Sequence, residues 1–204
     1  MSGTDRVRVG VLISGRGSNM ASLIAAAADP GYPARIALVV SNRPEAAGLD
    51  RAAAAGVPTA IVDHKAFPDR ESFERALDER LHTARIELVA LAGFMRVLTP
   101  WFVRRWEGRL VNIHPSLLPA FRGVDTHARA LAAGVAEHGC SVHLVTPELD
   151  AGPVLAQDAV PVLPGDTAET LAARVLEREH VLYPRALAEV ARGLDRERGN
   201  RARP

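Results

Sequence analysis

Two polar side chains stand at the end of a predicted strand in the segment VNIHPSLLPAFRG, residues 111–123. Asn112 and His114 are two positions apart, and side chains at that spacing point to the same face of a β-strand. An amide can stabilise a developing oxyanion while an imidazole moves or lends a proton. The pair therefore predicts a catalytic site at this strand end, although a histidine taken alone is more often a structural hydrogen-bonding residue.

A carboxylate in a later loop is the candidate partner of this pair. Asp150 lies in PELDAGP, residues 147–153. An aspartate in such a turn usually accepts hydrogen bonds from nearby backbone N–H groups, and this structural role stays open. If the loop folds over the strand that carries His114, the carboxylate would orient the imidazole and favour its protonated form.

A glycine-rich loop, SGRGSN at residues 14–19, follows the first predicted strand and precedes a helix. The free N–H groups of a helix start suit a phosphate. A dinucleotide fingerprint would place a third glycine where Met20 stands, and a Walker loop would continue with Gly-Lys-Ser/Thr. A compact turn without a ligand is the alternative. We expect the loop to hold the single phosphate of a mononucleotide-sized ligand.

The segment LAGFMRVL, residues 91–98, leaves a buried strand with three apolar side chains around an arginine. Phe94, Met95 and Val97 could form an apolar slot for a flat heterocycle, with backbone groups for its polar edge. Core packing beside a solvated Arg96 is the alternative.

A metal site is not expected. The segment HGCSVH contains His138, Cys140 and His143, but Cys140 and His143 would face opposite sides of a strand. Neither an HExxH motif nor paired CxxC motifs occur in the sequence. Cys140 is the only cysteine, so an intrachain disulfide is not possible.

The composition points to a globular protein of one domain, or of two halves that share a sheet. The chain has 204 residues, 48% of them hydrophobic, and a net charge of +1. So small a charge creates no global field for nucleic acid or an anionic membrane. The first residues lack the apolar core and small-residue cleavage site that are expected of a secretory signal. No apolar run approaches the ~20 residues that a membrane helix needs. We therefore expect a cytoplasmic protein.

The hydrophobic pattern alternates between strand and helix. It predicts strands at 7–14, 34–41, 59–63, 86–93, 110–114, 140–146 and 154–162, and helices at 19–28, 44–56, 68–84, 100–106 and 126–134. This order indicates an α/β fold: a mostly parallel twisted sheet of about seven strands with helices on both faces and a Rossmann-like N-terminal half. The last two strands could form a hairpin around residues 147–153. Ligands bind at the carboxyl ends of the strands in such sheets.

The last helix has several end signals. Asp166 with Glu169 resembles a capping box, and Thr99 with Pro100 resembles the start of an earlier helix. Pro184 predicts a kink. The charged tail, 195–204, is expected to fray.

Taken together, these motifs resemble a known family. SGRGSN, LAGFMRVL, NIHPSLLPAFRG, SVHLVTPELDAGPV and EREHVLYP, in this order and spacing, resemble the phosphoribosylglycinamide formyltransferases, which are folate-dependent enzymes of purine synthesis. The resemblance covers roughly residues 7–190. Relatives that formylate initiator tRNA carry an additional C-terminal domain, for which we expect no room in this chain.

The resemblance implies a domain organisation and a reaction. It implies one formyltransferase domain at 1–190, with a phosphate-binding half at about 7–100 and a catalytic half at about 101–190, followed by a charged tail at 191–204. The implied reaction transfers the formyl group of the co-substrate 10-formyltetrahydrofolate to the amine of 5'-phosphoribosylglycinamide (glycinamide ribonucleotide) in de novo purine biosynthesis. The amine attacks directly, through a tetrahedral intermediate, and no metal is required.

The resemblance also assigns roles to individual residues. Asn112 and His114 would stabilise the oxyanion and help to pass a proton to the leaving nitrogen, and Asp150 would favour protonated His114 and position a water molecule. The remaining binding residues are Gly17, Ser18 and Asn19 for the phosphate, Glu179 for the ribose hydroxyls, and Arg70, Phe94, Met95, Arg96, Val97, Leu98 and Asn112 for the folate. Asp125, in the 121–127 loop, is given no role.

Two other functions remain open at this point. A non-catalytic module could bind a phosphorylated ligand through the first loop alone, and a formyltransferase could act on another amine with the same three catalytic residues. We expect small-molecule substrates, no nucleic acid or membrane partner, and a monomer or homodimer.

Overall fold

The computed structural model describes residues 6–201 and has an α/β architecture. Its elements in chain order are β1 (Val7–Ile13), α1 (Ser18–Ala27), β2 (Ala34–Ser41), α2 (Gly48–Ala54), β3 (Thr59–Ile61), the 3-10 helix η1 (His64–Ala66), α3 (Arg70–Thr83), β4 (Leu88–Leu91), α4 (Pro100–Arg105), β5 (Leu110–His114), α5 (Thr126–Ala132), β6 (Glu137–Leu144), β7 (Val154–Pro161) and α6 (Ala168–Arg201).

The seven strands form one sheet in the order β3-β2-β1-β4-β5-β6-β7. β1 to β5 run parallel, whereas β6 is antiparallel to both β5 and β7. The predicted mostly parallel sheet of about seven strands is confirmed, and so is the hairpin around residues 147–153. From β1 the strands that follow in sequence lie first on one side (β2, β3) and then on the other (β4, β5). Open α/β sheets bind ligands at such a point, between β1 and β4 in this sheet.

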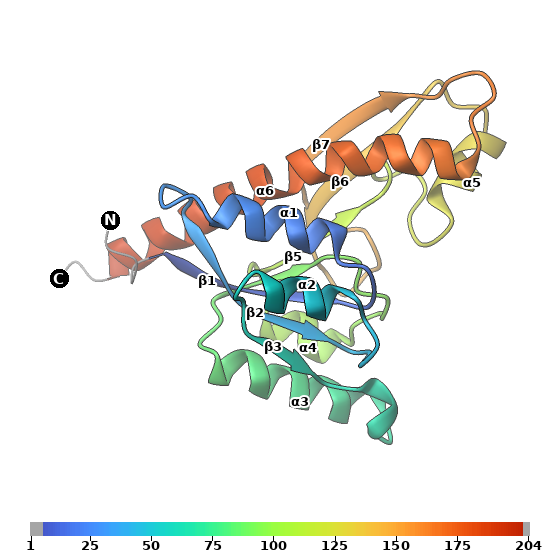
Figure 1. The fold of residues 1–204 in the computed structure, drawn as a ribbon. Coiled ribbons are helices and arrows are strands. Elements are labelled where there is room, and N and C mark those ends of the chain that lie inside the picture. The colour runs from blue at the N-terminus through green and yellow to red at the C-terminus, as the bar shows by residue number, and fades with distance from the viewer. Residues whose placement is uncertain (1–5, 202–204) are drawn as a thin grey trace.

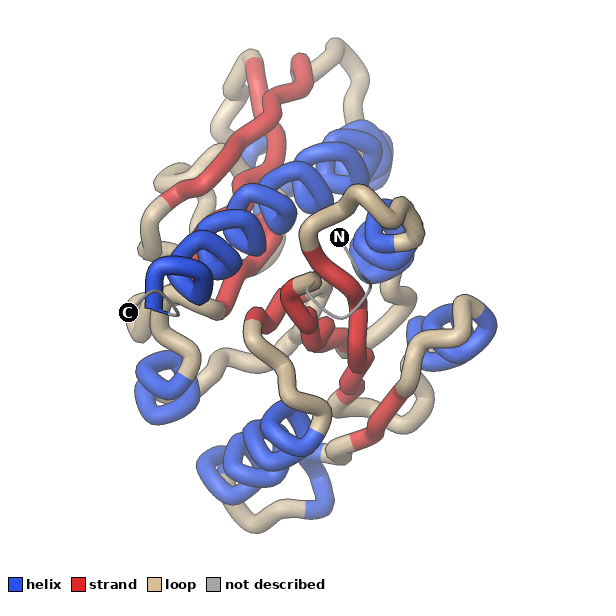
Figure 2. Tube along the Cα trace, turned by 90° about the vertical axis from the view of Figure 1, so that its left-hand side faces the viewer, coloured by secondary structure: helices blue, strands red, loops and turns tan. Residues whose placement is uncertain are grey.

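Helices cover both faces of the sheet, and the side chains of β1 point alternately to one face and to the other. Val9, Val11 and Ile13 belong to a buried cluster that includes side chains of α1, α2 and α6. Leu12 instead packs in a second cluster with side chains of α3 and α4. The two groups of helices lie on opposite sides of the strands (Figure 1). The longest helix, α6, runs across one face of the sheet (Figure 2).

Several predicted boundaries move by a few residues. α2 begins at Gly48 rather than near Pro44, because the Gly48 amide donates to the Gly15 carbonyl (3.0 Å) and residues 43–47 form turns against the first loop. β4 is shorter than the predicted 86–93, and Gly93, with a φ of 74°, follows its end. β6 spans 137–144 instead of 140–146, since its early residues pair with β7.

The beginning of α6 also differs from the prediction. The expected pair Asp166 and Glu169 does not form the cap; Thr167 and Thr170 exchange the hydrogen bonds of a cap one residue later. Asp166 instead forms an ion pair with Arg174, in which each carboxylate oxygen lies 2.8 Å from a guanidinium nitrogen. By contrast, the predicted cap of α4 by Thr99 is confirmed.

The charged tail was expected to fray from residue 195, and within the described residues this is wrong. α6 continues through Pro184 to Arg201, and Arg198 forms an ion pair with Glu87 at 2.7 Å. Ala191 is fully buried and Leu194 packs partly against the core, so the apolar face of the helix extends past residue 190. Residues 202–204 lie outside the described part of the chain. Across residues 6–201, none of the helices combines the length and apolar character needed to cross a bilayer.

Candidate active site

A cavity of about 610 Å³ opens at the carboxyl ends of β4 and β5. Most of its lining comes from β5, from the segment after β4 and from the loops before α5 and after β6; single residues of β4, α1, α4, β6 and α6 and the first turn of α5 complete it. Of the predicted site residues, it contains Asn19, Phe94, Met95, Arg96, Val97, Leu98, Asn112, His114, Asp150 and Glu179. Gly17, Ser18 and Arg70 are not among its lining residues.

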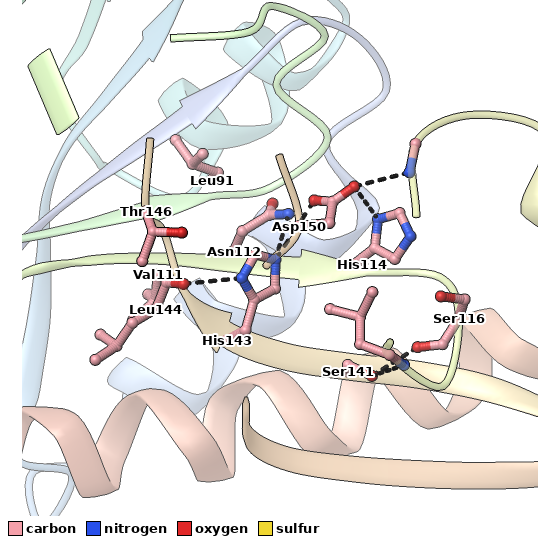
Figure 3. Close-up of polar contacts among 12 residues, drawn as sticks. Leu91, Val111, Asn112, His114, Ser116, Ser141, His143, Leu144, Thr146 and Asp150 are labelled. Atoms are coloured by element: carbon pink, nitrogen blue, oxygen red, sulfur yellow. Dashed lines mark hydrogen bonds and ion pairs between the residues drawn. The ribbon is translucent and has the colours of Figure 1, made fainter. Parts of the chain in front are cut away.

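Asn112 and His114 project from β5 into this cavity together, as their spacing predicts (Figure 3). His114 is 5% exposed. Its Nε2 lies 3.0 Å from the carbonyl oxygen of Phe121, and its Nδ1 lies 3.4 Å from Asp150 Oδ2. Both ring nitrogens therefore face acceptors, a pattern that the protonated imidazole with its two N–H donors satisfies fully.

Asp150 reaches His114 because its loop folds back over β5. The Gly123 amide donates to Asp150 Oδ2 at 2.9 Å, and Arg122 pairs with Glu148 at 3.1 Å, so the loops on either side of the site hold each other. Burial alone would raise the pKa of Asp150. The hydrogen bond from the Gly123 amide and the nearby imidazoles of His143 and His114 outweigh it, and the pKa lies below its ordinary value. The carboxylate is thus ionised at neutral pH.

A fourth polar residue of the site, His143, was considered in the sequence only as a metal ligand. It is the direct cross-strand partner of Asn112 in the antiparallel pair β5–β6. Its Nε2 lies 3.2 Å from Asn112 Nδ2 and 3.6 Å from Asp150 Oδ1. The signal that could have found it is the register of β5 and β6, which a single sequence does not specify.

The apolar wall of the cavity is the segment 94–98. Met95 and Val97 are 66% and 54% exposed, which is unusual for such side chains and leaves them available to a ligand. Buried polar contacts fix the segment at both ends. The Met95 amide donates to the Ser14 hydroxyl (2.8 Å), and the Thr99 amide donates to the buried carboxylate of Glu74 (2.8 Å).

Two polar residues from distant helices meet at the other side of the cavity. Asn19 Nδ2 of α1 donates to Glu179 Oε2 of α6 at 2.6 Å. Glu179 is 6% exposed. Burial raises its pKa, although the hydrogen bond from Asn19 acts in the opposite direction. Asn19 Oδ1 is buried and has no hydrogen-bond partner within the described chain, so an acceptor is free at this position.

The remaining predicted binding residues stand at the starts of two helices and do not line the cavity. Gly17 precedes α1 in the left-handed conformation (φ 70°), and Ser18 is the first residue of that helix. Arg70 is exposed at the first position of α3. Asp125, which was given no role, lines the cavity and precedes α5, also with a positive φ of 55°.

The histidines and the cysteine do not converge on a common point. Cys140 lies in the hydrophobic core, whereas His143 contacts Asn112 on β5. Within residues 6–201, no three side chains of the types His, Cys, Asp and Glu are arranged so that they could hold a metal ion.

Comparison with known proteins places this site in a family. Residues 7–187 match the formyl transferase family. The chain belongs to this family. Among formyl transferases of known structure, the phosphoribosylglycinamide formyltransferase of Brucella melitensis is 54% identical, with a TM-score of 0.88 over 91% of this chain and 96% of that one. The resemblance seen in the sequence is thereby confirmed.

Two curated relatives show how the same domain occurs in chains of different length. The phosphoribosylglycinamide formyltransferase of Escherichia coli strain K12 is 46% identical over 90% of this chain and 86% of its own length. The trifunctional purine biosynthetic protein adenosine-3 of Drosophila pseudoobscura pseudoobscura is 51% identical over 95% of this chain. The match covers only 14% of the length of that trifunctional protein.

Proposed function

We propose that this protein transfers the formyl group of 10-formyltetrahydrofolate to the amine of 5'-phosphoribosylglycinamide, a step of de novo purine biosynthesis. The observation that carries the proposal is the meeting of Asn112, His114 and Asp150 in one cavity that has an apolar wall on one side and a polar pair on the other. Membership of the formyl transferase family and the names of the relatives support the same reaction.

The reaction begins with attack of the substrate amine on the formyl carbon. The carbonyl π bond opens and its oxygen takes the negative charge of a tetrahedral intermediate. An N–H of Asn112 donates to this oxygen, and the charge of protonated His114 stabilises it from the same face of β5. Preorganised donors of this kind are often the largest single contribution to catalysis.

The intermediate collapses when the bond from carbon to the folate nitrogen breaks. The attacking amine loses a proton and the leaving nitrogen gains one, so the exchange is balanced without a covalent enzyme intermediate. His114 and a water molecule held by Asp150 carry the proton. Because His114 Nε2 contacts the Phe121 carbonyl at 3.0 Å, this ring nitrogen must exchange that partner for the substrate.

The ribonucleotide lies toward α1 in this proposal. The phosphate binds the N–H groups of Gly17, Ser18 and Asn19 at the start of the helix. The buried carboxylate of Glu179 and the free oxygen of Asn19 accept hydrogen bonds from the ribose hydroxyls. This arrangement brings the amine toward the centre of the cavity.

The folate lies against the segment 94–98. Phe94, Met95 and Val97 provide apolar contact for the flat ring, and the backbone of Arg96 and Leu98 contacts its polar edge. Exposed Arg70, at the start of α3, attracts the carboxylates at the other end of the folate. The enzyme works on small molecules in the cytoplasm, as a monomer or homodimer, without a nucleic acid or membrane partner.

The proposal is tested by measuring loss of the formyl group from 10-formyltetrahydrofolate, with and without the ribonucleotide, and by identifying the formylated product. We expect formyl transfer only when the ribonucleotide is present. In Asn112→Ala, kcat should fall by about 10²–10³-fold, the usual cost of losing one oxyanion donor. Asn200→Ala, which removes an exposed amide at the end of α6, is the matched control.

Two results would contradict this proposal, and each would assign a different function to the protein. Binding of the ribonucleotide without any formyl transfer would identify a binding module. Formylation of a different amine, with no turnover of 5'-phosphoribosylglycinamide, would identify another branch of the family.

A further inference from the structure

His143 makes one more contact that bears on the chemistry. This side chain is 2% exposed, and its Nδ1 lies 2.9 Å from the backbone oxygen of Leu144. On the other side of the ring, Nε2 faces Asn112 Nδ2 at 3.2 Å (Figure 3). Each nitrogen of the buried imidazole therefore has a partner of its own.

These partners define the tautomer of His143. A backbone carbonyl oxygen can only accept, so Nδ1 must carry the hydrogen. In the neutral ring, Nε2 is then an acceptor, and it needs a donor opposite. Asn112 must consequently present its NH₂ group, not its oxygen, to His143.

Asp150 does not change this assignment. A protonated His143 would direct an Nε2–H toward Asp150 Oδ1, but the separation of 3.6 Å is longer than a hydrogen bond. A hydrogen on Nε2 would also point at the N–H group of Asn112, whose Nδ2 lies 3.2 Å from Nε2, so two donors would face each other. The neutral ring satisfies the shorter contact, and Asp150 keeps its hydrogen bond from Gly123 and its contact with His114.

We infer that His143 is a positioning residue that holds the side-chain amide of Asn112 in its catalytic orientation. This inference rests on the proposed function, in which Asn112 is the oxyanion donor. One N–H of Nδ2 is bound by His143, and the second has no protein acceptor among residues 6–201 and is available to the formyl oxygen. Without His143, the amide can rotate by half a turn and oppose the oxyanion with its own oxygen.

The kinetic test compares two substitutions at this position. His143→Phe keeps a ring but removes the acceptor, and we expect kcat to fall by about 10- to 100-fold, within the cost of misplacing a reacting group. Both KM values should stay near wild type. His143→Gln, whose amide oxygen can occupy the place of Nε2, should recover part of the loss. His82→Phe, at a half-exposed histidine of α3, is the control.

A double substitution separates positioning from general support of the fold. Asn112→Ala/His143→Phe should be no slower than Asn112→Ala alone, because His143 acts through Asn112. Losses that multiply would overturn the inference. So would a Gln variant as slow as the Phe variant.

Nitrogen NMR of the wild-type histidines tests the tautomer without any activity measurement. We expect His143 to show a protonated Nδ1 and an unprotonated Nε2 at pH 7. A hydrogen on Nε2 would overturn the inference even if His143→Phe fails to fold. If wild-type protein transfers no formyl group, the proposed function fails instead, whatever the tautomer.

Discussion

At the scale of single residues, Asp150 shows how backbone and side chain together specify the site. Its φ of 48° is left-handed, a conformation that costs energy for a residue with a side chain but that aspartate tolerates. In this conformation the carboxylate lies 3.4 Å from His114 Nδ1. A turn residue with only a structural role would not need contact with a buried imidazole, so the geometry favours the catalytic role.

The coupling of Asp150 to His114 can be measured with a double-mutant cycle at pH 7. We expect Asp150→Asn and His114→Ala each to lower kcat by about 10²-fold or more, as for acid–base residues generally. The double variant should lose clearly less than the product of the two factors, because the residues act as a unit. Losses that multiply would leave Asp150 a structural turn residue.

Glu179 carries a stability cost that depends on pH. Its pKa is raised above 4.5 by burial, so the ionised form is disfavoured in the folded protein. The cost is fully present above the raised pKa and disappears as pH falls toward 4.5. Glu179→Gln should therefore have a higher Tm than wild type at pH 8, by about 2–4 °C for each kcal/mol relieved, and the difference should shrink toward pH 5.

The same substitution should raise the KM for the ribonucleotide, since the ribose loses a carboxylate acceptor. Thermal unfolding and steady-state kinetics at several pH values measure the two effects. Glu177→Gln, at an exposed carboxylate of the same helix, is the matched control and should show neither change. A Tm difference that is independent of pH would contradict the buried-charge explanation.

At the scale of elements, the loop between β1 and α1 depends on one glycine. Gly17 has a positive φ, and a Cβ there would lie 3.0 Å from the Cα of Gly48. The loop is thus packed against the start of α2 as well as being a candidate phosphate site. Gly152 has a comparable constraint after β6, where a Cβ would lie 1.8 Å from the Leu144 oxygen. The loops of the site are fixed by close backbone approach.

Gly17→Ala should therefore lower Tm and raise the KM for the ribonucleotide far more than the KM for the folate. The reason is that the substitution both strains the backbone and moves the N–H groups that face the phosphate. Gly15→Ala is the control in the same loop, because a Cβ at Gly15 meets no atom within 4 Å. Equal increases in both KM values would show that the loop has only a structural role.

At the scale of the whole molecule, the parts that follow from short sequence patterns were predictable. β5 and the pair Asn112 and His114 follow from strand alternation, and the sheet follows from alternating strands and helices. The role of His143 was not predictable, since it depends on the antiparallel register of β5 and β6. The contact of Asn19 with Glu179 joins residues 160 positions apart and requires the packing of α1 on α6. The division into a phosphate-binding and a catalytic half stays a prediction.

The proposed reaction relies on protein side chains and not on a metal ion, and this leads to a last prediction. Activity should survive exhaustive chelation, because His138, Cys140 and His143 do not converge on one point and the oxyanion has donors from the protein. Burial raises the pKa of Cys140 to about 12, so the thiol is not a nucleophile at neutral pH. Cys140→Ser should keep kcat within about twofold while lowering Tm, since it places a hydroxyl in the core. Loss of activity on chelation, restored by zinc, would contradict the mechanism.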